Sequence, residues 1–223
     1  MKVCVLIPVH NEAKAIGRVV SALRQKGLDA VVIDDGSSDG SGTIAQKEGA
    51  TVISTLKRSG KGGALQKGFE YLLNKDYEGL ILMDGDGQHA ISDIDAFLNE
   101  YKASGCEVIV GNRMHNAKGM PLIRRLTNRF MSWLISLVCG QIVPDTQCGY
   151  RWIKMDVLRT IRFTVFDFEI ETEILIQSSR KGFRIVSVPV QTIYDGEDSK
   201  IRPLLDTWRF TRYILREIFR GKS

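Results

Sequence analysis

The sequence has few of the residues that mark disulfide-rich or secreted chains. It contains 4 cysteines, 5 prolines and 3 histidines among 223 residues. The cysteines form no C-x-x-C pair and Cys4 lies inside an apolar run, so we expect reduced thiols in a cytosolic protein. The N-terminus lacks the basic and then apolar pattern of a signal peptide, and secretion is therefore not expected.

A long hydrophobic run is also missing. The longest strongly apolar stretch, residues 130–139, has about half of the roughly 20 residues needed to cross a bilayer. No transmembrane helix is predicted. Any membrane contact would therefore be peripheral, at the cytoplasmic face, or made through a separate membrane protein.

Composition and charge are those of one globular domain. Apolar residues make up 43% of the chain and charged residues 26%, which allows a single core over residues 1–223. The formal charge of +5 suits an anionic partner such as a nucleotide or a phospholipid, or equally a solubilising surface. Nucleic acid is not expected as a partner, because the sequence has no recognised nucleic-acid-reading motif.

The first half alternates short β-branched apolar runs with helical patterns. Strands are predicted at residues 3–7, 30–33, 51–53 and 79–83, and helices at 12–25, 42–48 and 63–73. This pattern indicates an α/β fold with a Rossmann-like, mostly parallel central sheet and flanking helices. The second half is less regular, with strands predicted at 107–110 and 184–190, helices at 122–139, 169–180 and 204–220, and a turn at 144–150.

Polar clusters follow three of the predicted strands, where ligands bind in sheets of this kind. The strongest contains Asp84 and Asp86, because two carboxylates at a strand end can hold Mg²⁺ or Mn²⁺ against a diphosphate. Gln88 or His89 could complete the metal ligands. Taken alone, an Asp-x-Asp segment is more often a plain turn.

Two further segments carry weaker signals. Asp35 ends a predicted strand and could accept hydrogen bonds from a nucleobase or ribose, while Asp39 or Ser41 caps the next helix. Residues 60–63 place glycines and Lys61 at a helix start, as a diphosphate contact would require. They match neither G-x-G-x-x-G nor a Walker A loop, which disfavours a nicotinamide dehydrogenase or an ATPase.

The motifs also occur in a specific order. The ordered segments span most of the chain: Ile7–Glu12, Asp34–Gly40, Gly60–Gly62, Asp84–His89, Gly111–Arg113 and Asp145–Arg151. This order resembles that of family 2 glycosyltransferases, and among them the dolichyl- or polyprenyl-phosphate mannose or glucose synthases. The resemblance implies the GT-A fold, a GDP-mannose or UDP-glucose type of donor, Mg²⁺ or Mn²⁺, a polyprenyl-phosphate acceptor and inversion of the anomeric centre.

The resemblance assigns roles residue by residue. Asp84 and Asp86 would be catalytic, and both would hold the metal with Gln88. Lys200 and Arg202 would supply a charge that relatives often carry as an arginine slightly earlier. Donor contacts would come from Pro8, Val9, Asn11, Glu12, Asp35 and Lys61. The acceptor phosphate and its pocket would be contacted by the catalytic Arg113 and Arg125 and by Arg124, Asp145, Gln147 and Arg151.

Two helices are predicted to be amphipathic and to contact the membrane surface, near residues 122–139 and 204–220. In the first, the apolar face holds Leu122, Leu126, Phe130, Trp133, Leu134 and Leu137. Its other face holds Arg124, Arg125, Asn128, Arg129, Ser132 and Ser136. Ordinary packing of both apolar faces on the core would explain the same pattern.

The implied reaction is direct attack of the acceptor phosphate oxygen on the anomeric carbon, while the metal stabilises the leaving nucleoside diphosphate. A phosphate is already ionised near neutral pH, so no strong base is required. A hydroxyl acceptor, as in cell-envelope polysaccharide synthesis, would need a carboxylate base, for which Asp145, Glu169 and Glu171 are candidates. Two further classes of protein share part of the pattern, a nucleotidyltransferase and a non-catalytic binding module.

Overall fold

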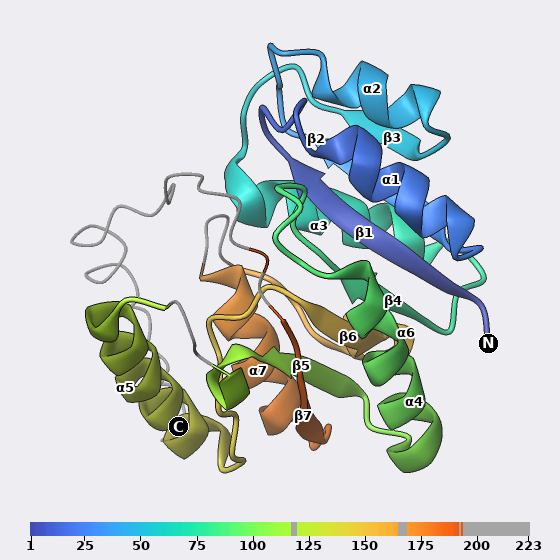
Figure 1. Ribbon diagram of the computed structural model, residues 1–223. Coiled ribbons are helices and arrows are strands. Elements are labelled where there is room, and N and C mark those ends of the chain that lie inside the picture. Colours follow the sequence, from blue (N-terminus) through green and yellow to red (C-terminus); the bar gives the residue numbers. More distant parts are fainter. Residues whose placement is uncertain (117–119, 165–168, 192, 194–223) are drawn as a thin grey trace.

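The central strand forms where the sequence is most continuously apolar. β1 (Val3–Val9) is buried along nearly its whole length and pairs in parallel with β2 (Asp29–Asp34) and β4 (Gly79–Leu82). Continuous apolar strands suit a parallel sheet that is covered on both faces. The computed structural model describes residues 1–116, 120–164, 169–191 and 193, and Figure 1 shows this sheet in the middle of the molecule.

The sheet has seven strands in the order β3-β2-β1-β4-β6-β5-β7. The remaining strands are β3 (Thr51–Ser54), β5 (Val108–Asn112), β6 (Arg151–Lys154) and β7 (Ile185–Pro189). Only β6 runs against its neighbours, β4 and β5. The predicted mostly parallel α/β sheet is therefore confirmed, although β6 itself, with four residues, was not predicted from the sequence.

Helices cover both faces of the sheet (Figure 1). One face carries α1 (Ile16–Gln25), α2 (Ser41–Lys47) and α4 (Ile94–Ser104), with the short 3-10 turns η1 (Ile91–Asp93) and η2 (Arg113–Asn116) in the connections. The other face carries α3 (Gly60–Leu73), α6 (Met155–Thr160) and α7 (Ile170–Arg180). α5 (Leu122–Cys139) packs against α7 at the side of the molecule and has the predicted bounds.

Two helix starts differ from the prediction. α1 begins at Ile16 rather than at residue 12, because the backbone amides of Glu12 and Ala13 donate to Ser41 and Asp39 instead of entering a helix. α3 begins at Gly60 rather than at residue 63, because the carboxylate of Asp35 accepts hydrogen bonds from its first amides. The helices α4 and α6 were not predicted.

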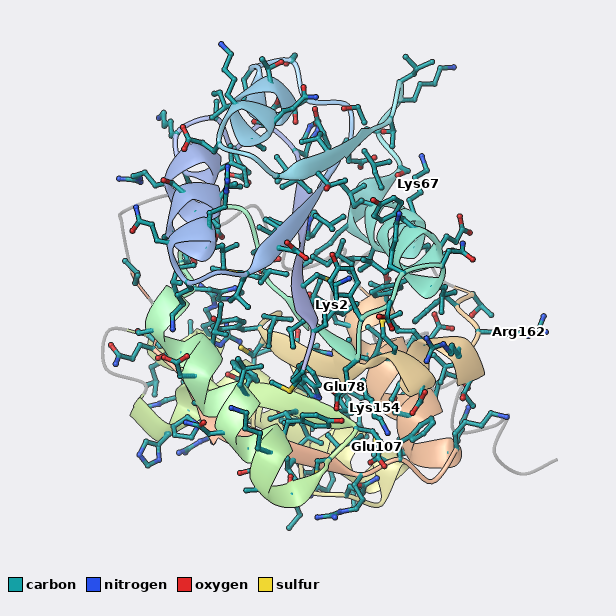
Figure 2. All side chains as sticks on the ribbon, turned by 90° about the vertical axis from the view of Figure 1, so that its right-hand side faces the viewer. Lys2, Lys67, Glu78, Glu107, Lys154 and Arg162 are labelled. Atoms are coloured by element: carbon teal, nitrogen blue, oxygen red, sulfur yellow. The ribbon has the colours of Figure 1, made fainter. Side chains whose placement is uncertain are left out.

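A charged row lies along the edge where the parallel strands begin. Figure 2 shows Lys2, Glu78, Lys154 and Glu107 near one another at this edge. Backbone hydrogen bonds join them in pairs, from Glu78 to Lys2 and from Lys154 to Glu107, each over 2.9 Å. This edge is opposite to the strand ends that carry the predicted site.

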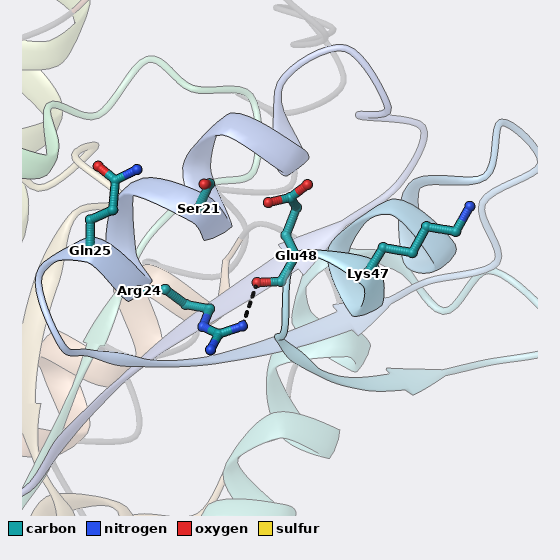
Figure 3. A pocket seen from close by; sticks show the side chains of 5 residues that line it. All are labelled: Ser21, Arg24, Gln25, Lys47 and Glu48. Atoms are coloured by element: carbon teal, nitrogen blue, oxygen red, sulfur yellow. Dashed lines mark hydrogen bonds between the residues drawn. The ribbon is translucent and has the colours of Figure 1, made fainter.

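A surface hollow also lies at this edge, at the C-terminal ends of α1 and α2 (Figure 3). Arg24 closes one side by donating to the backbone carbonyl of Glu48 over 3.2 Å. The hollow is lined by Ser21, Arg24, Gln25, Lys47 and Glu48. None of these residues belongs to the predicted site.

Candidate active site

The acidic segment after β4 lies against a lysine from α3 and a glutamate from α7. Lys61 Nζ is 2.6 Å from Asp84 Oδ1 and 2.6 Å from Glu171 Oε1, and we call these three residues the Lys61 cluster. Burial alone would lower the pKa of Lys61, but the two carboxylates raise it above its usual value. Burial would raise the pKa of Asp84, but Lys61 holds it at about 2. Lys61 and Asp84 are therefore both ionised at neutral pH.

Gly149 lies directly over the Lys61 cluster. A Cβ atom at this position would be 2.8 Å from Asp84 Oδ2, 3.1 Å from Glu171 Oε1 and 3.2 Å from Lys61 Nζ. Any other residue would therefore push the three charged groups apart. Behind the cluster, Arg151 Nη2 is 3.8 Å from Glu171 Oε2, so Glu171 lies between two cations.

Asp86, unlike Asp84, has acidic neighbours and no ion-paired lysine in the described part of the chain. Burial and the neighbouring charge of Asp84 raise its pKa, and its described hydrogen bond comes from the Gln88 amide over 2.9 Å. Glu12, at the end of β1, adds further negative charge to its surroundings. Among the described residues no lysine, arginine or histidine lies within ion-pair distance of Asp86. A cation would therefore be stabilised here.

The oxygen atoms at this position suit a hard divalent cation. The Asp86 carboxylate and the Gln88 side-chain amide supply such oxygens, whereas the described residues contain no group of three or more His, Cys, Asp or Glu side chains that could hold a metal. Mg²⁺ commonly uses one or two carboxylates together with substrate phosphates. The residues thus fit a metal that is shared with a bound diphosphate.

His89 lies under the acidic segment and supports it. Its ring stacks on Tyr150 with 4.6 Å between centroids, and its Nδ1 accepts a hydrogen bond from the Asp84 amide over 3.2 Å. Burial lowers the pKa of His89, so the imidazole is neutral near pH 7. With Nδ1 as the acceptor, the ring carries its proton on Nε2, which is 4.0 Å from Asp84 Oδ2.

Arg113 follows β5 and is held by a buried carboxylate. Its Nε and Nη2 donate to Asp145 Oδ2 and Oδ1 over 2.8 and 2.9 Å. Asp145 is fully buried and holds Arg113, and its predicted contact with substrate stays a prediction. On α5, the Nε of Arg125 is buried and has no hydrogen-bond partner among the described residues, so it could receive an anion.

Arg151 is buried behind the Lys61 cluster. Its side chain is fully buried, and its guanidinium donates to the backbone carbonyls of Cys148, Thr146 and Glu171. These hydrogen bonds hold the 145–150 segment against α7. Arg151 therefore supports the segment that holds Asp145 and Gly149, and its predicted contact with substrate stays a prediction.

The carboxylate of Asp35, directly after β2, is bound by the start of α3. Asp35 accepts hydrogen bonds from the amides of Ser59 and Gly60 over 2.8 Å, and these bonds lower its pKa although burial acts to raise it. The carboxylate of Asp35 thus caps α3, and its contact with the nucleoside stays a prediction.

Asn11 links the loop after β1 to the loop after β2. It has a left-handed backbone with φ of 58°, and its side chain accepts a hydrogen bond from the Ser38 amide.

The remaining predicted site residues are placed as follows. Val9 is buried at the end of β1 beside the half-buried Pro8, so a donor contact there would use the backbone. Gln147 is half-buried, and Arg124 is exposed on α5. Lys200 and Arg202, and the predicted helix 204–220, lie outside the described residues.

α5 turns its apolar side outward. Phe130 and Trp133 are 62% and 58% exposed, and their rings pair with 6.0 Å between centroids. The other exposed apolar side chains of this helix are Leu122, Ile123, Leu126 and Leu137. Of the predicted apolar face, Leu134 is packed against the core, whereas the other five side chains are exposed. No described helix is long and apolar enough to span a membrane.

A mostly parallel sheet covered by helices on both faces, with an acidic segment at the carboxyl end of a central strand, is the arrangement of the GT-A fold. Residues 4–162 match glycosyl transferase family 2, and the chain belongs to this family. Glycosyltransferase AglJ of Haloferax volcanii is 31% identical over 92% of this chain and 68% of its own length.

Two further proteins are similar to this chain. Undecaprenyl-phosphate mannosyltransferase of Micrococcus luteus is 29% identical over 85% of this chain and 84% of its own. A crystal structure of glucosyl-3-phosphoglycerate synthase from Mycobacterium tuberculosis, in complex with Mn²⁺, UDP and phosphoglyceric acid, superimposes with a TM-score of 0.71 at 19% identity. That match covers 98% of this chain and 78% of the other.

Sequence reasoning missed three residues of this site. Gly149 was considered only as part of the 145–151 segment that would line the acceptor pocket, and Glu171 only as a base. Asn128, whose side-chain amide donates to Asp145 over 2.8 Å, was placed only on the polar face of its helix. Gly149 lies within a motif that was recognised, but its contact with the Lys61 cluster depends on α3 and α7. The spacing of Asn128 and Ser132 by one helical turn was the available signal for a shared polar contact.

Proposed function

We propose that this glycosyltransferase moves a hexose from a nucleotide-sugar of the GDP-mannose or UDP-glucose type to a polyprenyl phosphate, with inversion of the anomeric centre. The observation that supports the proposal is that the Lys61 cluster and Asp86 lie near Arg113 at the carboxyl ends of the strands. Arg113 is close enough to Asp84 to lower the pKa of that carboxylate. A cationic and an acidic subsite thus adjoin at one sheet edge.

The state of the candidate bases favours a phosphate acceptor over a hydroxyl. Asp145 is engaged by Arg113, and Glu171 lies between Lys61 and Arg151. A carboxylate engaged by cations is poorly disposed to take a proton, whereas a phosphate oxygen needs no such base. A relative named for undecaprenyl phosphate supports the same choice.

Asp86 and Gln88 would hold Mg²⁺ or Mn²⁺ together with the donor diphosphate. A divalent cation at this position supplies charge stabilisation for the departing nucleoside diphosphate. Lys61 neutralises part of the acidic cluster and so lowers the cost of bringing a diphosphate next to it. Arg113 and Arg125 orient the acceptor phosphate.

The outward apolar face of α5 supports a peripheral position at a membrane, where the acceptor lipid would reside. Phe130, Trp133 and their apolar neighbours would enter the lipid interface, and the exposed Arg124 and Arg129 would meet lipid phosphates. Replacement of both aromatic residues by serine should weaken binding to vesicles with anionic phospholipid at least about tenfold. Leu56→Ser, at an exposed apolar side chain outside α5, is the control.

The test of the proposed reaction is release of nucleoside diphosphate from a panel of GDP- and UDP-sugars. Reactions contain Mn²⁺ or Mg²⁺, with and without a short polyprenyl phosphate. We expect release that depends on both metal and lipid phosphate, and that Asp86→Ala abolishes. The control is Asp76→Ala, which removes an exposed carboxylate at the opposite edge. Release that depends on a sugar acceptor instead of the lipid would overturn the phosphate acceptor.

A further inference from the structure

α5 packs with polar residues inward. Asn128 and Ser132 are only 4% and 3% exposed, one turn apart on the side that faces the protein. Burial of polar side chains is unfavourable unless their hydrogen bonds are made. Here they are made: Ser132 Oγ donates to Asn128 Oδ1 over 3.0 Å and accepts from the Thr146 amide over 3.0 Å. We call this set the polar seam of α5.

The polar seam ends on the carboxylate that holds Arg113. Asn128 Nδ2 donates to Asp145 Oδ1 over 2.8 Å, and Arg113 donates to the same carboxylate through Nε, Nη2 and its backbone amide. An ionised carboxylate offers about four acceptor positions. Four donors fill them, so the Asp145 side chain has one fixed orientation.

Arg113 is fixed in turn. Its Nε and Nη2 edge is occupied by Asp145, and Nη1 makes no hydrogen bond with any residue that the structure describes. The guanidinium therefore presents its Nη1 group in a set direction. A pre-oriented arginine loses little side-chain entropy when it binds an anion.

We infer that Asn128 is a positioning residue for the acceptor: through Asp145 it sets the direction in which Arg113 meets the acceptor phosphate. Asn128 itself touches no reacting group. The inference rests on the proposed function, since it takes the lipid phosphate as the anion that Arg113 receives. It also gives a reason why this helix buries Asn128 and Ser132 beside the apolar Ile135 on its inner side.

The test is Asn128→Asp, which keeps the side-chain shape but replaces the donor with a second carboxylate against Asp145. We expect the KM for a short, water-soluble polyprenyl phosphate to rise about tenfold, because a buried charge-assisted hydrogen bond is lost. The donor KM and the slow donor hydrolysis without acceptor should stay within about twofold of wild type. The acceptor KM should recover as pH falls, because protonation of the introduced carboxyl restores a donor.

The matched control is Thr127→Asp, which adds the same charge at the next residue on the exposed side of α5. It should leave both KM values unchanged in this membrane-free assay. If Asn128→Asp does not fold, Ser132→Ala is the milder variant. It should raise the acceptor KM about threefold with the same separation from the donor KM, because Asn128 Oδ1 loses the neutral hydrogen bond from Ser132.

A double-mutant cycle separates positioning from a purely structural role. In an Arg113→Ala background, Asn128→Asp should raise the acceptor KM no further, because both changes act through one group. Equal effects in the two backgrounds, or a matching rise in donor KM, would overturn the inference. If the wild type transfers sugar to no polyprenyl phosphate, the proposed function fails and the inference with it. If the wild type transfers and Asn128→Asp keeps its acceptor KM, the inference alone fails.

Discussion

The two halves of the sheet hold their polar side chains in different ways. Near β1 and β2, carboxylates bind backbone amides of a neighbouring loop, as when Asp35 caps α3 and Asp39 accepts from the first residue of α2. Near β5 and β6, charged side chains bind each other across long sequence separations, as Arg113 and Asp145 do. In the first half a side chain is therefore fixed by a backbone amide, whereas in the second half two side chains fix each other.

The Lys61 cluster joins the two halves of the sheet. Of the substitutions considered, Gly149→Ala should disturb this cluster most and cause the largest loss of activity. The added methyl group would meet Asp84, Glu171 and Lys61 at 2.8 to 3.2 Å. A shift of about 1 Å in such a site can lower kcat/KM about a hundredfold. Gly105→Ala is the control, since it strains a left-handed backbone, with φ of 66°, but has open space around it. It should lower stability by about 1 kcal/mol and leave kcat/KM unchanged. Equal activity loss in both variants would contradict this expectation.

Glu171→Gln tests whether the cluster or a general base is needed. The amide can still accept a hydrogen bond from Lys61 but carries no charge. We expect kcat/KM to fall about tenfold, with an unchanged shape of its pH profile between about pH 6 and 8. A steep loss of kcat together with a lost acidic limb of the pH profile would indicate a base. Glu70→Gln removes the same charge from the exposed side of α3 and should have no effect.

Asp145→Asn should destabilise the protein in a way that depends on pH. Burial acts to raise the pKa of Asp145, but the hydrogen bonds and charge of Arg113 lower it below its unfolded value of about 3.9. Its contribution is therefore fully present above about pH 5 and is lost as pH falls through the folded pKa. The deficit of the variant in free energy of unfolding should be about 3 kcal/mol near neutral pH and shrink on acidification. Urea titrations at several pH values measure it, and a deficit that grows on acidification would refute the ion pair.

Substitution of Asn11, in the loop after β1, should have the smallest effect on stability. Asn11→Gly keeps the left-handed backbone at low cost but loses the side-chain contact to Ser38, whereas Asn11→Ala also meets the strain of positive φ. The alanine variant should be less stable than the glycine variant by about 1 kcal/mol. Thermal unfolding of the pair gives this difference, and a more stable alanine variant would exclude the left-handed conformation.

Much of the first half could be predicted from the sequence. The buried runs of β1, β2 and β4 and the polar residues after them fall where they were expected, because hydrophobic periodicity and turn chemistry act over a few residues. The beginnings of α1 and α3 were misplaced, since side chains from other loops occupy the first amides. β6 was missed because its four residues form a strand only between β4 and β5.

The site, too, has features that the sequence predicts and features that depend on tertiary packing. The motif order led to family 2 and placed the acidic segment at a strand end, and that alone identified Asp84 and Asp86 as candidates. It could not show that Asp145 and Arg151 are buried, because burial depends on which elements pack over them. The same holds for the contact of Gly149 with the Lys61 cluster.

The sequence by itself determined the class of fold, the family, the position of the acidic segment and the two-faced character of α5. These features follow from local periodicity and from motifs whose chemistry is carried by neighbouring residues. Only the tertiary structure decided which face of α5 turns inward, that Lys61 lies between Asp84 and Glu171, and that Asn128 reaches Asp145. Such contacts join elements that are distant along the chain, so their geometry is fixed only when the whole sheet and its helices are assembled.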